Sequence, residues 1–191
     1  MAMAVRAEQQ AKTGKMTYAD YAAMPDDGHR YQVIEGKLTM TPAPNMLHQE
    51  ALANLFRLVD DHVRGAGLGK VLFAPCDVVL SDENVVQPDL LFISKERLNI
   101  ITDANVQGAP DLVVELLSPG TANLDRTRKR DLYARFGVRE YWLVSPEAGT
   151  AEVLVLRKAA FERLGLHGAG DGVTSEVLSG LSFKTDVVFE E

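Results

Sequence analysis

Apolar residues recur at helical spacing between residues 46 and 65, and the glycines of "GAGLG" follow directly. A second helix is predicted over residues 123–137, "NLDRTRKRDLYARFG", and a short one through "TYADYAAM", which Thr17 can cap. When residues 46–65 are helical, one face carries Leu47, Leu52, Leu55, Leu58, Val59 and Val63.

Shorter apolar runs predict the strands. "RYQVIEGKLTMTP" alternates on both sides of Glu35-Gly36, as the two strands of a hairpin do. The order helix, hairpin, helix, three strands, helix and strands predicts an α/β fold in which helices cover one mixed sheet. The remaining strands are predicted in "KVLFAPCDVVL", "VVQPDLLFI", "PDLVVELL" and "EYWLVSP" and over residues 151–157 and 173–178, with a turn-rich loop in "LHGAGDG".

One acidic residue interrupts the strand "PDLVVELL". Val113, Val114, Leu116 and Leu117 form a run typical of a strand that is buried on both faces, and Glu115 stands in the middle of it. A carboxylate is almost never fully buried unless it is paired or binds a metal. Glu115 is therefore either a structural acid paired with an arginine or a functional acid.

A second carboxylate, Asp89, lies in the neighbouring apolar run "VVQPDLLFI", directly after Pro88. The helix that follows Glu115 carries Asp125, Lys129 and Tyr133 on nearly one face, because they are four residues apart. Separately, Asp89 is explained by a turn and Lys129 by a solvated basic face. Together, two strand-borne carboxylates and a lysine are the parts of a phosphodiesterase site that uses Mg²⁺ or Mn²⁺.

Length and composition limit the alternatives. A chain of 191 residues with 46% hydrophobic and 25% charged residues is typical of one globular domain. The net charge of −7 argues against a protein that grips nucleic acid with its whole surface. No apolar stretch is long enough for a membrane helix, and the lone Cys76 fits a reducing cytoplasm. Residues 1–15 are predicted to be a flexible tail.

Several of these segments together resemble a known family. "QPDLLFI", "GAPDLVVELLSPGT", the spaced Asp125 and Lys129, and "YARFGVREYWLVSP" resemble the Uma-two family of endonucleases, which belongs to the PD-(D/E)XK nuclease superfamily. The resemblance extends from Met16 to about Leu181. It implies a single nuclease domain over residues 16–191. Its fold would be a restriction-endonuclease-like mixed sheet flanked by helices, with an N-terminal hairpin and extra C-terminal strands.

The resemblance also implies site residues. Pro88-Asp89 matches the first half of the superfamily motif and Glu115 the second, so Asp89 and Glu115 would hold Mg²⁺ or Mn²⁺. The lysine normally found two residues after the second acid is replaced by Leu117. Lys129 on the following helix would take its place.

The family's N-terminal hairpin and its histidine are present in altered form. Glu35 keeps an acid before Gly36, whereas Gln32 and Lys37 replace acids that are common in relatives. His48, near the start of the long helix, would contact a phosphate or a metal-bound water, unless it only caps the helix or lies at the surface. By resemblance, Glu35 and His48 join Asp89, Glu115 and Lys129 as candidate catalytic residues.

The sequence thus favours a Mg²⁺- or Mn²⁺-dependent endonuclease that hydrolyses DNA phosphodiester bonds, with a homodimer as one way to cut both strands. Gln32 and the acidic charge keep open a catalytically weak or silent binding or assembly protein of the same fold, and a phosphodiesterase for another nucleic acid is a third interpretation. Acyl transfer is disfavoured because no Gly-x-Ser-x-Gly motif is present, and a nucleotide cofactor because no glycine-rich phosphate loop is present.

Overall fold

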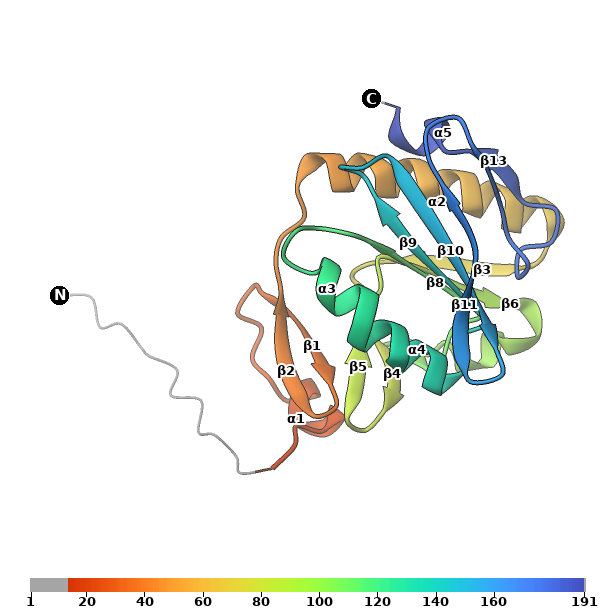
Figure 1. The fold of residues 1–191 in the computed structure, drawn as a ribbon. Coiled ribbons are helices and arrows are strands. Elements are labelled where there is room, and N and C mark those ends of the chain that lie inside the picture. Colours follow the sequence, from red (N-terminus) through yellow and green to blue (C-terminus); the bar gives the residue numbers. More distant parts are fainter. Residues whose placement is uncertain (1–13, 191) are drawn as a thin grey trace.

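The part of the chain that the structure describes, residues 14–190, forms two mixed β-sheets, a small two-stranded sheet and five α-helices in a computed structural model (Figure 1). The predicted α/β class is confirmed. The tail predicted over residues 1–15 lies almost entirely outside the described residues, and Lys15 at its end pairs with Glu83. None of the described helices is long and apolar enough to cross a membrane.

The N-terminal hairpin belongs to a five-stranded sheet with the order β2-β1-β5-β4-β7, in which only β4 and β7 run parallel. Glu35 and Gly36 both have positive φ, which is the backbone conformation of a two-residue hairpin turn. The predicted hairpin is therefore confirmed. The strands are β1 (Arg30–Ile34), β2 (Lys37–Thr41), β4 (Val78–Ser81), β5 (Asn84–Val86) and β7 (Val106–Gln107).

The larger sheet has six strands in the order β11-β10-β9-β8-β6-β3, and only β8 and β9 run parallel. Its central strands are buried on both faces, which explains their continuous apolar runs. The strands are β3 (Gly69–Phe73), β6 (Leu90–Ser94), β8 (Leu112–Leu116), β9 (Glu140–Ser145), β10 (Thr150–Arg157) and β11 (Ala160–His167).

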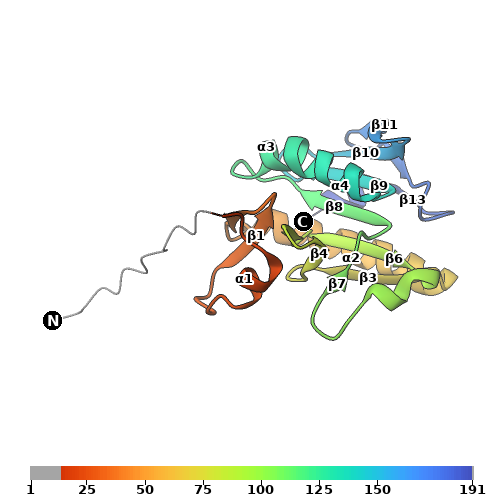
Figure 2. The ribbon, with the colours of Figure 1, turned by 90° about the horizontal axis from the view of Figure 1, so that it is seen from below.

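Helices cover both faces of this sheet (Figures 1 and 2). On one face, α2 (Met46–Ala66) packs its apolar side, including Leu55, against Val114 of β8. On the other face, Leu132 packs against Val113. Leu132 belongs to a helical stretch made of α3 (Ala122–Leu124), a π-helical turn η2 (Asp125–Lys129) and α4 (Arg130–Phe136). Both long predicted helices are thus confirmed, the second with a π turn inside it.

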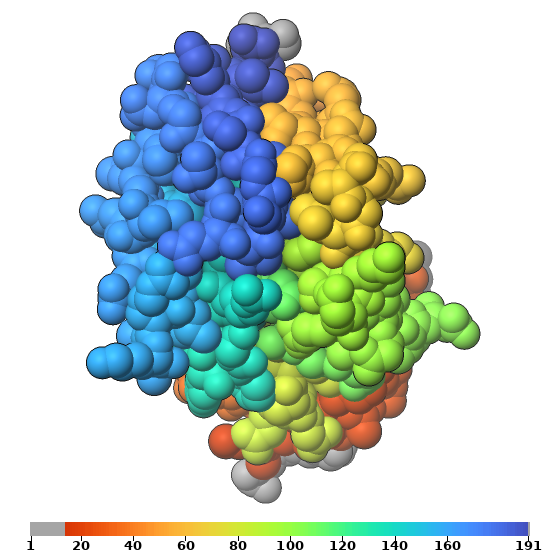
Figure 3. Space-filling model, turned by 90° about the vertical axis from the view of Figure 1, so that its right-hand side faces the viewer, coloured from red at the N-terminus to blue at the C-terminus, as the bar shows by residue number. Residues whose placement is uncertain are grey.

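The C-terminal segment lies beside α2, where Figure 3 shows it (blue) in contact with the helix (orange to yellow). It contains the two-stranded sheet of β12 (Gly172–Thr174) and β13 (Ser182–Lys184), followed by α5 (Asp186–Phe189). The predicted strand over residues 173–178 is therefore shorter than expected. The other short elements are α1 (Tyr18–Ala22), which Thr17 caps as predicted, and the 3₁₀ helix η1 (Lys95–Ile100).

The expectation of one mixed sheet was wrong in the number of sheets, because two of the predicted strands each divide into two strands that join different sheets. "KVLFAPCDVVL" divides at Pro75 into β3 and β4, and "VVQPDLLFI" divides at Pro88 into β5 and β6. Proline lacks the amide hydrogen that a strand interior needs. In both cases one half pairs in the six-stranded sheet and the other joins the sheet of the hairpin, where Val85 pairs with Val33.

The apolar segment "EYWLV" forms the interior of the protein. It is strand β9, between β8 and β10, and Tyr141 and Trp142 are fully buried. Glu140 in the same strand accepts hydrogen bonds from Trp142 Nε1 and from the backbone of residues 176 and 177. The strand predicted from this segment is therefore an interior strand of the larger sheet.

Candidate functional site

The two carboxylates predicted from neighbouring strands lie next to each other. Strands β6 and β8 are antiparallel and pair Leu90 with Val114, so Asp89 and Glu115 each stand one residue beyond this pair. Asp89 Oδ2 accepts a hydrogen bond of 2.7 Å from the backbone N–H of Leu116. Because Pro88 and Asp89 lie outside β6, the Asp89 side chain is available at the end of the strand rather than packed within the sheet.

Glu115 faces the helical stretch of residues 122–136 and not α2, as the alternation of side chains along β8 requires. Val113 and Leu117 pack on the face that α4 covers, whereas Val114 and Leu116 pack on the α2 face. Glu115 lies between Val113 and Leu117 in this alternation and is only 3% exposed. Its charge is therefore met by groups on the helix and not by solvent.

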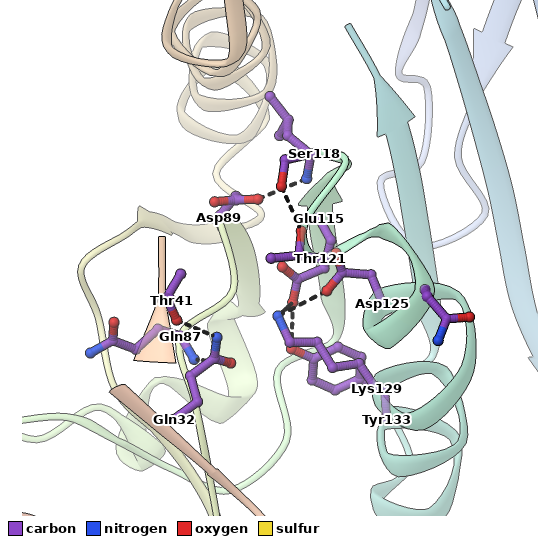
Figure 4. A network of polar contacts seen from close by, with 12 residues as sticks. Gln32, Thr41, Gln87, Asp89, Glu115, Ser118, Thr121, Asp125, Lys129 and Tyr133 are labelled. Atoms are coloured by element: carbon purple, nitrogen blue, oxygen red, sulfur yellow. Dashed lines mark hydrogen bonds and ion pairs between the residues drawn. The ribbon is translucent and has the colours of Figure 1, made fainter. Parts of the chain in front are cut away.

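Three helical side chains surround Glu115, as Figure 4 shows. Lys129 Nζ lies 3.0 Å from Glu115 Oε1 and 3.1 Å from Asp125 Oδ1. The hydroxyl of Tyr133 donates to the same Oε1 atom over 2.7 Å. The predicted shared face of Asp125, Lys129 and Tyr133 is thus confirmed. Asp125 and Lys129 both lie in the π turn η2, a helical irregularity that is frequent at functional sites.

Burial dominates the electrostatics of this cluster. It raises the pKa of Glu115 to about 8; Lys129 opposes the rise, and the charges of Asp125 and Asp89 add to it. Burial by itself lowers the pKa of Lys129, but the surrounding carboxylates, above all Glu115, reverse this and hold it above its ordinary value. The lysine therefore stays charged. Burial, and next Glu115, raise the pKa of Tyr133 well above its usual range, so its hydroxyl keeps its proton.

The cluster opens into a cavity of about 250 Å³. The hairpin and loop 42–45 form one wall, and loop 118–121 with the helix forms the other, where Ser118 Oγ and Thr121 Oγ1 lie 2.9 Å apart. The lining residues of this cavity with charged or titratable side chains are Arg30, His48, Asp89, Glu115, Asp125 and Lys129. Positive and negative groups thus meet in one partly enclosed space.

His48 lies at this cavity, and its contact with a phosphate or a metal-bound water stays a prediction. Its backbone N–H donates to Asn45 Oδ1, which caps α2. Its side chain is only 12% exposed, and Nε2 lies 3.4 Å from Asp89 Oδ2. The imidazole therefore stands against the carboxylate of Asp89 and restricts where that carboxylate can move. Its Nδ1 atom is buried and has no hydrogen-bond partner in the described part of the chain.

Gln32 also lines the cavity, on the wall formed by the hairpin. It is 3% exposed, its Nε2 donates to Thr41 Oγ1 over 2.9 Å, and its Oε1 accepts from the backbone N–H of Gln87 over 3.2 Å. Gln87 Nε2 in turn donates to Asp77 Oδ1. The amide thus holds the hairpin against residue 87.

The structure does not bring Glu35 to the cavity. Its carboxylate is half exposed at the tip of the hairpin, where it pairs with Arg135 at 3.0 Å and Arg128 at 3.5 Å. The hydrogen bond from Arg135 lowers the pKa of Glu35. Lys37, on the other side of the turn, is exposed. The expectation that groups Glu35 with Asp89, Glu115 and Lys129 is therefore not met by the geometry, because its carboxylate pairs with two arginines of the helix outside the cavity.

Polar residues of the cavity that reasoning from the sequence missed include Gln87, Ser118 and Thr121. Gln87 directly precedes the Pro88-Asp89 pair, and "SPGT" at 118–121 directly follows the strand of Glu115. Both positions are loops at the end of a site-bearing strand, where polar side chains commonly gather around a site. Their position next to the strands of Asp89 and Glu115 was the signal that could have identified them.

Comparison with known proteins shows the family and the fold of this chain. The model of the Uma2 family, described as "Putative restriction endonuclease", matches residues 18–186. The chain belongs to this family. A solved structure from Anabaena variabilis, described as "a putative nuclease belonging to DUF820", is similar over 91% of this chain and 97% of its own, with 18% identity and a TM-score of 0.76. The predicted restriction-endonuclease-like fold is therefore confirmed. No curated protein matches the chain.

Proposed function

We propose that this member of the Uma2 family is a divalent-metal-dependent endonuclease that hydrolyses phosphodiester bonds of DNA in the cavity beside Glu115. The observation that carries the proposal is the meeting of Asp89, Glu115 and Lys129 at one cavity. Two carboxylates and an ammonium group, from two strands and a helix, are the groups that phosphodiester hydrolysis uses. The family to which the chain belongs supports the same class of reaction.

The carboxylates fit Mg²⁺ or Mn²⁺ better than a metal that needs a full protein cage. Residues 14–190 contain no cluster of three or more His, Cys, Asp and Glu side chains suited to hold a metal. Mg²⁺ is commonly bound through one or two carboxylates and keeps several waters. Asp89 and Glu115 supply two carboxylates, and the cavity of about 250 Å³ beside them has room for water. When bound, the cation supplies positive charge against the oxygens of the phosphate.

The residues of the chain would share the remaining tasks. The ammonium of Lys129 stabilises the negative charge that grows on the phosphate as water attacks the phosphorus atom and the bridging oxygen leaves with a proton. Asp125 and Tyr133 fix Lys129 and Glu115 in place through their contacts with these side chains. His48 restrains Asp89. Such restraint matters because small displacements of reacting groups cost large factors in rate.

The test is cleavage of supercoiled plasmid DNA in Mg²⁺ and, separately, in Mn²⁺. Wild type should convert the plasmid to nicked or linear forms only with the cation, and Asp89→Asn and Glu115→Gln should lose at least about a hundredfold in rate. The exposed Glu176→Gln, which removes the same charge far from the cavity, is the matched control and should cleave like wild type. Equal cleavage by all four proteins would show contamination and refute the proposal.

One observation favours a second candidate, a catalytically weak or silent binding protein of the same fold. Gln32 brings an amide rather than a carboxylate to the cavity wall, and the resemblance to the family implies an acid at this position. This candidate predicts that the wild type binds DNA without cutting it in either cation. An RNA of the same sequence, tested in parallel, separates a DNA enzyme from a phosphodiesterase for another nucleic acid.

A further inference from the structure

Among the residues that the structure describes, Arg30 is a cation of the cavity that no carboxylate neutralises. Arg30 begins β1, pairs across the hairpin with Thr41, and lines the cavity together with Thr41 and Gln32. Residues 30 and 32 alternate with residue 31 along the strand, so their side chains lie on the same face. Because Gln32 is buried at the cavity wall, this alternation directs Arg30 to the same cavity, nearer its rim.

The contacts of Arg30 leave its guanidinium available for a ligand. Its Nη2 donates to the carbonyl oxygen of Pro42 at 3.5 Å, which is a long hydrogen bond, and no carboxylate among residues 14–190 pairs with it. A guanidinium has five N–H donors, so most of them remain unused. An arginine at the rim of a cavity with unused donors and an unneutralised charge is suited to a phosphate.

The other cations near the cavity are already engaged. Lys129 pairs with Glu115 and Asp125. The charge of the basic tract at 126–130, "RTRKR", suggests a contact with DNA. However, Arg126 pairs with Glu152, and Arg128 pairs with Glu35. Arg130 donates to the carbonyl of Phe161. None of these three arginines lines the cavity, whereas Arg30 does.

We infer that Arg30 binds a phosphate of the DNA strand adjacent to the phosphate that is cut. This inference rests on the proposed function, since it needs a strand whose scissile phosphate reaches Asp89 and Glu115. A strand that crosses the cavity passes its next phosphate over the rim, where Arg30 can make two parallel hydrogen bonds to its oxygens. A phosphate contact fixes the position of the strand and reads no base, so the contribution of Arg30 is independent of DNA sequence.

The experiment measures binding of a short single-stranded DNA oligonucleotide by fluorescence anisotropy, with Ca²⁺ in place of Mg²⁺, at a series of salt concentrations. Arg30→Gln should raise the Kd about tenfold at low salt, because the variant loses a charge-assisted hydrogen bond to the phosphate. It should also reduce the slope of log Kd against log salt by about 0.7, because one fewer phosphate is neutralised. Arg30→Lys should keep the slope and raise the Kd by less.

The matched control is Arg57→Gln. Arg57 is exposed on α2, about 14 Å along the helix from His48, and like Arg30 it pairs with no carboxylate of residues 14–190. The two variants therefore change the net charge equally, and Arg57→Gln should leave both Kd and slope near the wild-type values because distant exposed charges are screened. Thermal melting of each variant shows that the fold is intact.

Cleavage kinetics supply a second readout. Arg30→Gln should raise KM with little change in kcat, since Arg30 binds the strand in the ground state and the transition state alike. Equal Kd values and equal salt slopes for wild type and Arg30→Gln would overturn this inference while the proposed hydrolysis stands. A wild-type protein that neither binds nor cuts DNA would overturn both.

Discussion

Lys129 Nζ lies 3.0 Å from Oε1 of Glu115, and each of the two residues is 3% exposed. A buried ion pair of this kind adds little net stability, because desolvation of both charges offsets their attraction. Removal of one partner is different, because the other charge stays buried without compensation. The pair therefore makes Glu115 tolerable in an apolar strand and links the sheet to the helix.

Lys129→Met should destabilise the protein by roughly 3 kcal/mol at alkaline pH, where Glu115 is ionised, because a buried carboxylate loses its main partner. In the double variant with Glu115→Gln, most of this loss should be recovered. Urea unfolding of the wild type, both single variants and the double variant measures the coupling. A Lys129→Met protein as stable as wild type would show that the pair carries no such energy.

The raised pKa of Glu115 predicts the sign of a pH effect. The folded protein keeps a proton on Glu115 up to about pH 8, whereas the unfolded chain releases it near 4.5. The free energy of unfolding therefore falls as pH rises between these two values, by at most ~1.4 kcal/mol per pH unit, and levels off above them.

Glu115→Gln should remove that contribution, because glutamine does not titrate. The measurement is the difference in unfolding free energy between wild type and Glu115→Gln at several pH values from weakly acidic to weakly alkaline. Since groups other than Glu115 titrate equally in both proteins, they cancel in this difference. A difference that does not change with pH would contradict the raised pKa.

Mg²⁺ or Mn²⁺ should raise the melting temperature of the wild type by a few degrees at millimolar concentration, because a cation that binds only the folded state stabilises it. Asp89→Asn should abolish the shift. Glu176→Gln, with the same loss of charge at the surface, should keep it. Differential scanning fluorimetry is sufficient, and an equal shift in both variants would place the cation elsewhere.

Glu35→Gln should leave cleavage within about threefold of wild type and change stability by less than about 1 kcal/mol, since its ion pairs with Arg128 and Arg135 are solvent-exposed. Plasmid cleavage and urea unfolding of this single variant decide the point. Loss of cleavage comparable to that of Glu115→Gln would show that Glu35 acts at the site despite its position at the tip of the hairpin.

Gln32→Glu places an acid at the cavity wall. The new carboxylate can no longer donate to Thr41 and is buried, so stability should fall by roughly 1–3 kcal/mol. In return, the shift in melting temperature with Mn²⁺ should grow, because another carboxylate faces the cation. Titration of Mn²⁺ against wild type and Gln32→Glu tests this, and an unchanged shift would show that residue 32 lies outside the reach of the cation.

Much of the site followed from local pattern. Glu115 stood out because a carboxylate in an apolar strand needs a partner, and the four-residue spacing placed Asp125, Lys129 and Tyr133 on one helical face. Both signals are local, since they depend on the repeat of a strand or a helix. The hairpin at Glu35-Gly36 was predictable for the same reason, because the turn itself requires those backbone angles.

The tertiary structure decided which similar residues differ in role. Pro110-Asp111 has the same form as Pro88-Asp89, yet Asp111 is buried against Arg97 and the backbone of Ser94, away from the cavity. The tertiary structure also places Glu35 outside the predicted group of site residues. It divides each of two apolar runs between two sheets. These outcomes depend on contacts between segments far apart in the chain, and such contacts leave no periodic trace. Sequence alone thus determined which chemical groups the site contains, and packing determined which of several similar residues lie together in it.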